Sequence, residues 1–310
     1  MGLNLSEWKY RNILEERGGP VKSLSYYRVA NYPGEHCFAE LRPELIPKLD
    51  KKSIIYRDGG GQGSSTKSVA QSSYKAISES LEAWAFYETY KSQYASMYGF
   101  DIAPSSMGMA CYPGLTSRTA RKNAMNEAIE RWSVIAWWDG NIGIKKVKTI
   151  PFINNLTCEV YLLDGLWEGS HTVILQSISL EKCHYIYSFA TSSTIDLAIQ
   201  KAEEELCRNS RSIDRYTTVN NFTNEAQLLG SIESLKSLTE KRLIFFATQK
   251  GKELFDSKCR QKSKTQLKTP DLIINKEIVG PWSKYATVWR CLLRPTSPKF
   301  LENSTEYFMF

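Results

Sequence analysis

Two glutamates one helical turn apart lie in the segment 105–138. The segment opens on a loop that contains glycine, and small or apolar residues then recur at helical spacing along one face. That face consists of Ala120, Ala124, Met125, Ala128, Ile129, Trp132 and Ala136. Glu127, Glu130 and Arg131 border it, and the spacing of three places both carboxylates on the same side of the predicted helix. A single pair of this kind is typical of a solvated rim beside a buried face, so it does not by itself indicate chemistry.

The same pattern recurs twice more in the chain. Upstream, the glycine-rich stretch 57–68 leads into a predicted helix that carries Glu79 and Glu82 at the same spacing. Downstream, a loop rich in serine and threonine leads into a predicted helix in which Glu205 interrupts a small, apolar face. Converging carboxylates repel one another and their pKa values rise unless cations lie among them. We therefore interpret the three helices as parts of one site, with Mg2+ as the expected cation because it prefers oxygen ligands and phosphates.

At these residues the sequence resembles a known family. The order of its motifs is similar to that of the YcaO family, from about residue 20 to about residue 300. The order is a glycine-rich loop before A..E..E, then S.GMA before A...A..E..ER, and last A...A..E. YcaO proteins bind ATP and Mg2+ and phosphorylate peptide-backbone amide oxygens. The resemblance implies a mixed α+β fold in which β-sheets and three glutamate-bearing helices converge on a nucleotide and Mg2+ site. It also implies a single domain over 21–310, after an N-terminal extension over 1–20 that faces a partner or a second copy in a homodimer.

The resemblance assigns roles to residues of this sequence. Those that match the family's ATP- and Mg2+-binding glutamates are Glu79, Glu82, Glu127, Glu130 and Glu205. Arg131 matches a phosphate-contacting arginine, and Lys201 stands where the family commonly has arginine, so it would bind phosphate without a bidentate fork. Ser64, Ser65 and Lys67 are candidates for phosphate or ribose contacts. No residue is assigned as a catalytic acid or base.

The sequence departs from the family pattern at four positions. Ala83 replaces the arginine of the first motif, and Gln62 replaces the lysine of a Gly-Lys-Gly loop. Met107 replaces the asparagine of a Ser-Asn-Gly turn, and Arg208 replaces a glutamine that often follows the third-helix glutamate. Because all five glutamates are present, we interpret these changes as divergence within the family and not as loss of activity.

The expected activity is ATP- and Mg2+-dependent activation of a backbone amide in a ribosomally synthesised precursor peptide, as in the maturation of bacteriocin-like natural products. Attack by a Cys, Ser or Thr side chain would give an azoline, sulfide a thioamide, and an amine an amidine. The chain ends without the Pro-rich tail typical of azoline-forming members, which favours the other two products. A stand-alone domain of this length leaves no room for a fused leader-recognition domain. We therefore expect a separate leader-recognition protein, with a sulfur-delivery protein or a dehydrogenase as a further partner.

Two other hypotheses stay open. One is a non-catalytic ATP-binding scaffold that holds the precursor peptide or a partner enzyme. The other is an unrelated hydrolase with a pair of carboxylates, which the spacing along a helix disfavours because glycosidase carboxylates face each other across a cleft. The sequence contains neither GxxxxGK[ST] nor GxGxxG, so its glycine runs alone do not indicate a nucleotide site.

Composition narrows the class of protein. The net charge of +7 suits anionic partners such as a nucleotide or an acidic peptide. The basic run 258–268 has no interleaved aromatic residues, which favours a solvated loop over nucleic-acid binding. Seven scattered cysteines and three histidines argue against a disulfide framework and a zinc site, and fit a reducing cytoplasm. No apolar run approaches membrane-spanning length.

Periodicity predicts the remaining elements. A short polar helix is predicted over 6–19 and strands with turns over 21–56. Stretches of alternating apolar residues predict a β-meander over 157–164, 171–180 and 184–192, and a last strand over 284–295. Residues 217–255 show no clear pattern.

Overall fold

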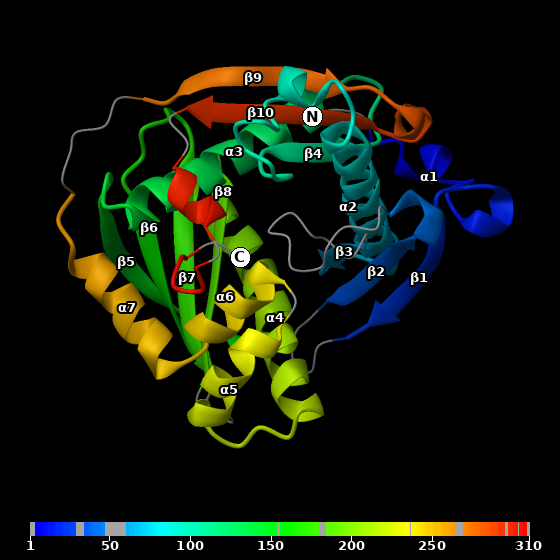
Figure 1. Cartoon of the computed structure of the whole chain (residues 1–310). Coiled ribbons are helices and arrows are strands. Elements are labelled where there is room, and N and C mark those ends of the chain that lie inside the picture. Colours follow the sequence, from blue (N-terminus) through cyan, green and yellow to red (C-terminus); the bar gives the residue numbers. More distant parts are fainter. Residues whose placement is uncertain are drawn as a thin grey trace. The chain divides into compact units, whose positions relative to one another are not determined.

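The computed structural model describes residues 4–28, 34–46, 60–153, 156–179, 184–235, 237–263, 269–294, 297–302 and 304–308. The described residues form both helices and antiparallel sheets, in agreement with the predicted α+β fold (Figure 1). The chain forms two compact units. The first comprises 1–49, 57–128 and 271–296, and the second comprises 50–56, 129–270 and 297–310. The described residues of the predicted extension 1–20 belong to the first unit, and the domain boundary at residue 21 stays a prediction.

The first unit contains two antiparallel sheets of three strands. One has the order β1-β2-β3 and consists of β1 (Val21–Tyr27), β2 (Glu35–Leu41) and β3 (Gly60–Ser65). The other has the order β4-β10-β9 and consists of β4 (Met109–Tyr112), β10 (Thr287–Arg294) and β9 (Asp271–Ile278). The central strand β10 confirms the strand predicted over 284–295.

Three helices begin in the first unit: α1 (Ser6–Lys9), α2 (Val69–Tyr90) and α3 (Arg118–Trp138), which continues into the second unit. The prediction of a helix over 6–19 is wrong beyond Lys9. The chain turns back there, because the Val21 N–H donates to the Ile13 carbonyl at 3.0 Å and Gly18 adopts a left-handed conformation with φ of 76°. Glycine adopts that conformation without the steric cost of a side chain.

The second unit is built on an antiparallel meander of the order β5-β6-β7-β8. Its strands are β5 (Ile144–Pro151), β6 (Thr157–Leu163), β7 (His171–Ser179) and β8 (His184–Ser192). The last three confirm the predicted meander over the described residues. The edge strand β5 was not predicted, because its lysine-rich middle is exposed and lacks apolar alternation. Lysines on an edge strand discourage pairing with another chain.

Helices cover both faces of this meander. They are α4 (Ile195–Val219), α5 (Glu225–Ser231), α6 (Leu238–Phe246) and α7 (Gln249–Arg260). Ser188 of β8 donates a hydrogen bond to the Ala202 carbonyl of α4, whereas the neighbouring Tyr187 ring lies 4.8 Å from the ring of Phe255 on α7. Because successive strand residues point to opposite faces, α4 and α7 lie on opposite sides of the sheet.

The core of the second unit is strongly aromatic. The buried Phe308 ring has its centroid within 6.1 Å of six other rings. These belong to Trp137, Trp138, Tyr187, Phe189, Phe246 and Phe255. The segment Ser297–Phe308 is also anchored by Arg242, whose guanidinium donates to the carbonyls of Phe300, Glu302 and Ser304.

Short 3-10 turns complete the described structure: η1 (Glu15–Arg17), η2 (Pro43–Leu45), η3 (Ala95–Tyr98), η5 (Ile232–Ser234), η6 (Pro281–Lys284) and η7 (Pro298–Leu301).

Candidate functional site

The glycine-rich stretch, predicted as a loop, forms strand β3 over Gly60–Ser65. A Cβ atom at Gly61 would lie 2.1 Å from the Ala76 carbonyl oxygen of α2, and one at Gly63 would lie 2.0 Å from that of Ser72. The two glycines therefore let the helix backbone lie directly on the strand. This close packing explains Gly61 and Gly63 without a ligand, and residues 57–59 of the predicted loop lie outside the described residues.

Close approach of α2 brings Glu79 to the strand. The Gln62 backbone N–H donates to Glu79 Oε2 at 2.9 Å, and Lys75 Nζ donates to the Ser64 carbonyl at 2.6 Å. The Ser64 hydroxyl is buried in a hydrogen bond of 2.7 Å with His36 Nδ1, while Lys67 is exposed. Position 62, where glutamine replaces the family's lysine, contacts Glu79 through its backbone N–H, so this hydrogen bond does not depend on the side chain at that position.

Glu82 and Glu127 belong to the same unit and act electrostatically on a residue that the sequence did not single out, Arg290 of β10. Glu82 is 8% exposed and Arg290 is fully buried. Desolvation lowers the pKa of Arg290 to about 9, and the carboxylates of Glu127 and Glu82 oppose this shift, so the guanidinium is charged at neutral pH. A lone arginine within the apolar strand sequence 287–293 was the available signal for it.

Arg290 holds the loop that precedes α3. Its guanidinium donates to the carbonyls of Tyr98 at 2.7 Å, Ser105 at 2.7 Å, Ala103 at 2.9 Å and Met107 at 3.4 Å. Met107 therefore contributes its backbone oxygen, whatever its side chain. The next residue, Gly108, has φ of 74°, and a Cβ there would lie 2.1 Å from the Cys291 carbonyl oxygen. The loop that opens the second motif is thus fixed by β10.

The second unit gathers three of the predicted site residues around the end of β8. Glu130 of α3 accepts a hydrogen bond from the Thr191 backbone N–H at 2.9 Å. Lys201 of α4 donates to the Thr191 carbonyl at 3.5 Å. Arg131 lies with its Nε 3.7 Å from Glu130 and its guanidinium 5.0 Å from the centre of the Phe189 ring. An acidic and two basic side chains therefore meet at one short stretch of strand.

Glu205, one turn beyond Lys201 on α4, forms an ion pair with Arg208. The arginine that departs from the family pattern thus neutralises the carboxylate that the pattern assigns to the metal. The side chain of Glu205 is 43% exposed, so exchange of this partner for another cation requires little desolvation.

The predicted residues therefore divide between the units. Ser64, Lys67, Glu79, Glu82 and Glu127 lie in the first, and Glu130, Arg131, Lys201 and Glu205 in the second. Helix α3 carries Glu127 and Glu130 one turn apart. Over the described residues, no group of three or more His, Cys, Asp or Glu side chains could hold a metal by itself. The oxygen donors still fit Mg2+, which is commonly bound by one or two carboxylates and completed by phosphates and water.

Cysteine chemistry is disfavoured in the described part of the chain. Burial raises the pKa of the thiols at Cys158, Cys207, Cys259 and Cys291 to about 12. It also raises the pKa values of Cys37 and Cys111. Thiols with raised pKa values hold their proton at neutral pH and are poor nucleophiles.

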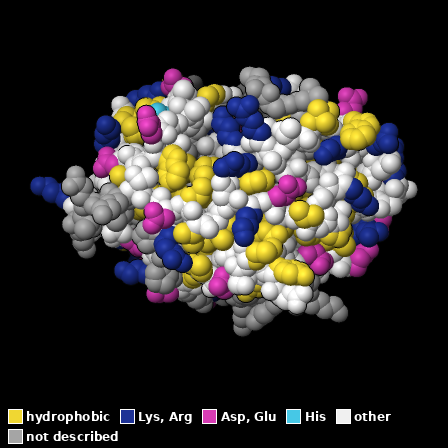
Figure 2. All heavy atoms as spheres, turned by 90° about the horizontal axis from the view of Figure 1, so that it is seen from above, with side chains coloured by type: hydrophobic (Ala, Val, Ile, Leu, Met, Phe, Trp, Pro, Cys, Tyr) yellow, Lys and Arg dark blue, Asp and Glu magenta, His cyan; other side chains and the backbone are white. Residues whose placement is uncertain are grey.

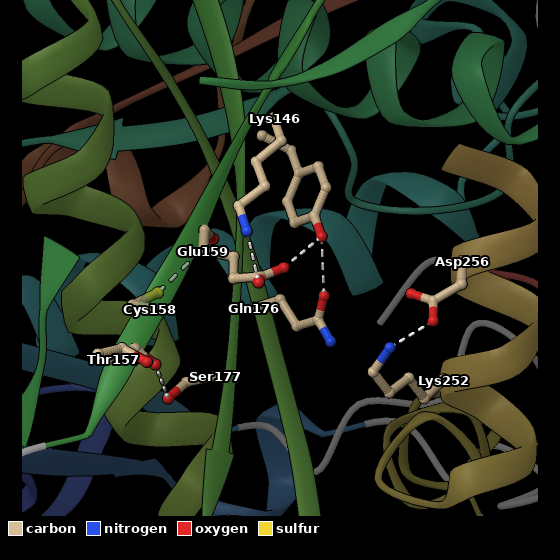
Figure 3. Close-up of polar contacts among 9 residues, drawn as sticks. Lys146, Thr157, Cys158, Glu159, Gln176, Ser177, Lys252 and Asp256 are labelled. Atoms are coloured by element: carbon tan, nitrogen blue, oxygen red, sulfur yellow. Dashed lines mark hydrogen bonds and ion pairs between the residues drawn. The ribbon is translucent and has the colours of Figure 1, made fainter. Parts of the chain in front are cut away.

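A second polar cluster lies in the second unit, outside the predicted site (Figure 3). Lys146 Nζ of β5 lies 2.6 Å from Glu159 Oε1 of β6, and the Tyr161 hydroxyl donates to Glu159 Oε2 at 2.5 Å. Desolvation raises the pKa of Glu159, but the hydrogen bonds from Lys146 and Tyr161, together with the positive charges of Lys146 and Lys252, outweigh it and lower the pKa. These groups satisfy one another, so the cluster links β5 to β6 and needs no ligand.

None of the described helices combines the length and the apolar character that a membrane crossing demands. On the face in Figure 2, lysine and arginine side chains are scattered among hydrophobic and acidic ones and do not form one continuous stripe.

No family model matches the sequence, and no curated protein matches it. One similar structure is that of YcaO from Methanopyrus kandleri bound with AMPPCP and Mg2+. The alignment covers 96% of this chain and 91% of the YcaO chain, with a TM-score of 0.54 and 14% sequence identity. Another is a heterocyclase in complex with substrate and cofactor. The alignment covers 93% of this chain and 51% of the heterocyclase chain, with a TM-score of 0.57 and 12% sequence identity. The chain has the fold of the YcaO proteins.

Proposed function

We propose that this chain uses ATP and Mg2+ to activate a backbone amide of a ribosomally synthesised peptide by phosphorylating the amide oxygen. Support comes from the YcaO fold and from the neighbour that binds AMPPCP and Mg2+. The observation that carries the proposal is the arrangement at Thr191, where Glu130 and Lys201 hold the two backbone groups of one residue. Fixed carboxylate and ammonium groups side by side suit a metal-bound phosphate.

Each predicted residue has a role in this proposal. Glu79, Glu82, Glu127, Glu130 and Glu205 would hold Mg2+ and ATP. Arg131 and Lys201 would bind phosphate oxygens, and Ser64 and Lys67 are proposed to contact phosphate or ribose. Bound Mg2+ would neutralise charge on the phosphates during transfer. The stacking of Arg131 on Phe189 fixes its guanidinium in advance, which reduces the entropy lost on binding.

The proposed reaction has two stages. The amide oxygen attacks the γ-phosphorus of ATP, and the bond from that phosphorus to the β–γ bridging oxygen breaks, which releases ADP. A nucleophile then adds to the amide carbon, and phosphate leaves with the former amide oxygen. A Cys, Ser or Thr side chain gives an azoline, sulfide a thioamide, and an amine an amidine. A leader-recognition protein, with a sulfur-delivery protein or a dehydrogenase, would complete the system.

The test is ATP hydrolysis by the purified chain with Mg2+ and its leader-recognition protein, with and without the precursor peptide encoded beside its gene. We expect ADP release that depends on both Mg2+ and the peptide, and a peptide product whose mass shows exchange of oxygen for sulfur or loss of water. Fragmentation then separates an azoline from an amidine. Absence of Mg2+-dependent ATP binding would contradict the proposal.

The ion pair between Glu205 and Arg208 favours a second candidate, a non-catalytic ATP-binding scaffold. A carboxylate engaged by arginine is a weaker metal ligand, so nucleotide could bind without efficient phosphoryl transfer. Stoichiometric ATP binding with no ADP release in the presence of peptide and its recognition protein would identify the scaffold.

A further inference from the structure

The first unit contains a pocket of about 300 Å³ with a strongly basic lining. Its lining residues are Trp8, Lys9, Arg11, Asn12, Arg17, Gly18, Lys284 and Tyr285. Four of these carry a positive charge, and none of the described residues that line the pocket is acidic. The pocket shares no residue with the predicted nucleotide site.

Two stretches from opposite ends of the sequence build this pocket. Helix α1 ends at Lys9, and the left-handed Gly18 reverses the chain, so that Arg17 returns toward Arg11 and donates to its carbonyl at 2.8 Å. From the other side, turn η6 presents the exposed Lys284 beside the buried Tyr285. The backbone turns therefore fix the positions of the cations.

Aromatic rings support two of the cations. The Arg11 guanidinium lies 5.7 Å from the centre of the Trp8 ring, and the Lys284 ammonium lies 4.8 Å from that of Tyr285. Both distances are within the range of cation–π attraction. The rings thus hold the charged groups in place, and a face of each ring is already covered by a cation.

The cations are poorly neutralised by the protein. Within the described residues, Lys9, Arg11 and Lys284 make no ion pair, and Arg17 approaches the exposed Glu16 at 4.0 Å. Like charges around one cavity repel one another, and an anion placed among them removes that repulsion. Trp8 is 60% exposed at the same place. Exposed tryptophan beside arginine is the composition typical of residues that dominate binding interfaces.

We propose that this pocket binds an acidic segment of a peptide, with carboxylate side chains among the four cations and an apolar neighbour against Trp8. Arg11 and Arg17 offer the planar fork that matches a carboxylate. The pocket is compact, whereas a polynucleotide requires a basic track along its backbone. This proposal does not rest on the amide activation proposed above.

Fluorescence anisotropy without ATP tests the proposal. The probe is a labelled peptide with aspartates around a phenylalanine, compared with the same peptide carrying asparagine in place of each aspartate. We expect the acidic peptide to bind about tenfold or more tightly than its neutral counterpart, with an affinity that falls as salt rises. The variant Arg11→Gln/Lys284→Gln should lower the affinity for the acidic peptide about tenfold. Its control is Lys91→Gln/Lys276→Gln, which removes the same charge from exposed positions of the first unit outside the lining and should change the affinity less than about twofold.

Equal affinity for the two peptides, or an equal loss in both double variants, would overturn the proposal. So would a single-stranded oligonucleotide that binds more tightly than the peptide and depends on Arg11 and Lys284. Thermal melts show whether each variant is folded, and Trp8→Ala, which removes only an exposed ring, provides a second test. This variant should weaken the binding of the acidic peptide and leave the melting temperature of the protein nearly unchanged.

Discussion

Both units contain an antiparallel meander whose last strand leads into a long, capped helix. In the first unit β3 precedes α2, and the Ser68 hydroxyl accepts from the Gln71 N–H. In the second β8 precedes α4, and the Thr194 hydroxyl accepts from the Leu197 N–H. In each, a glutamate binds a backbone N–H of the last strand. The same local solution therefore serves two different sheets.

The two regions differ in how the helix meets the strand. Glycines let α2 lie against the backbone of β3, whereas side chains separate α4 from β8, with the Ser188 hydroxyl donating to the Ala202 carbonyl at 2.7 Å. The first-unit carboxylate, Glu79, comes from the packed helix itself, and the second-unit carboxylate, Glu130, comes from α3. The position of Glu79 thus depends on the glycines that let α2 approach β3. Glu130 instead lies on α3, and its own hydrogen bond to Thr191 links that helix to the sheet.

The largest predicted effect is at the arginine that anchors the first unit's second motif. Arg290→Met removes the donor shared by buried carbonyls and should lower the free energy of unfolding by about 3 kcal/mol or more. Denaturant unfolding followed by circular dichroism measures the loss, and chymotrypsin should then cut after Tyr98 or Phe100. The control Arg294→Met, at the exposed end of the same strand, should leave both readouts nearly unchanged. If the Arg290 variant is as stable as wild type, the loop that precedes α3 keeps its structure without the hydrogen bonds from Arg290.

Next in size is the close packing that distinguishes the first region from the second. Gly63→Ala places a methyl group against the Ser72 carbonyl and the Ala76 N–H, which only a shift of α2 can relieve, and should cost about 2 kcal/mol. Gly165→Ala is the control, because its Cβ would meet its nearest atom at an ordinary 3.6 Å. Equal unfolding free energies for both variants would remove the structural reason for the glycines of β3.

A smaller change is expected at the ion pair of the second region. Arg208→Gln frees Glu205 and restores the residue type that the family pattern has there. Because the pair is partly exposed, stability should fall by less than about 1 kcal/mol. Titration calorimetry should show tighter binding of Mg2+ and ATP together. Weaker binding would show that Arg208 itself contacts the nucleotide.

The smallest effect concerns pH and the cluster of Figure 3. The pKa of Glu159 is lowered in the folded state, so its ion pair stabilises the protein above the unfolded-state pKa, and that contribution is lost as pH falls through the folded-state pKa. Glu159→Gln should lower the unfolding free energy at neutral pH by less than about 1 kcal/mol. The difference from wild type should shrink under acid conditions. A difference that is constant with pH would rule out the charge as its source.

Sequence periodicity predicted elements whose signal is local. Alternation marked β6, β7 and β8, and the capping residues Ser68 and Thr194 stand where the long helices begin. The glycine-rich stretch was assigned to a loop because its strand conformation depends on contact with α2, not on its own propensity. The N-terminal helix was predicted too long because pairing with β1 overrides its propensity.

In the candidate site, too, local features were predicted and long-range contacts were not. Motif spacing placed Glu130 and Lys201 on two helices, and the structure brings both to Thr191. Neither the Glu205–Arg208 pair nor the role of Arg290 was predicted. The partners of Arg290 lie more than 180 positions away in the sequence, and no local pattern reports a contact of that range.

Peptide-dependent ATP hydrolysis by Glu130→Gln tests the central claim most directly. The glutamine oxygen can still accept from the Thr191 N–H, so the melting temperature should be nearly unchanged, while loss of the charge would remove a proposed ligand of Mg2+. We predict a fall in turnover of about two orders of magnitude, which corresponds to about 2.7 kcal/mol in the activation free energy. Glu159→Gln is the matched control, since it removes a paired glutamate of the same unit outside the site. Wild-type turnover by Glu130→Gln, with ATP still raising its melting temperature, would contradict the assignment of these glutamates to the nucleotide site.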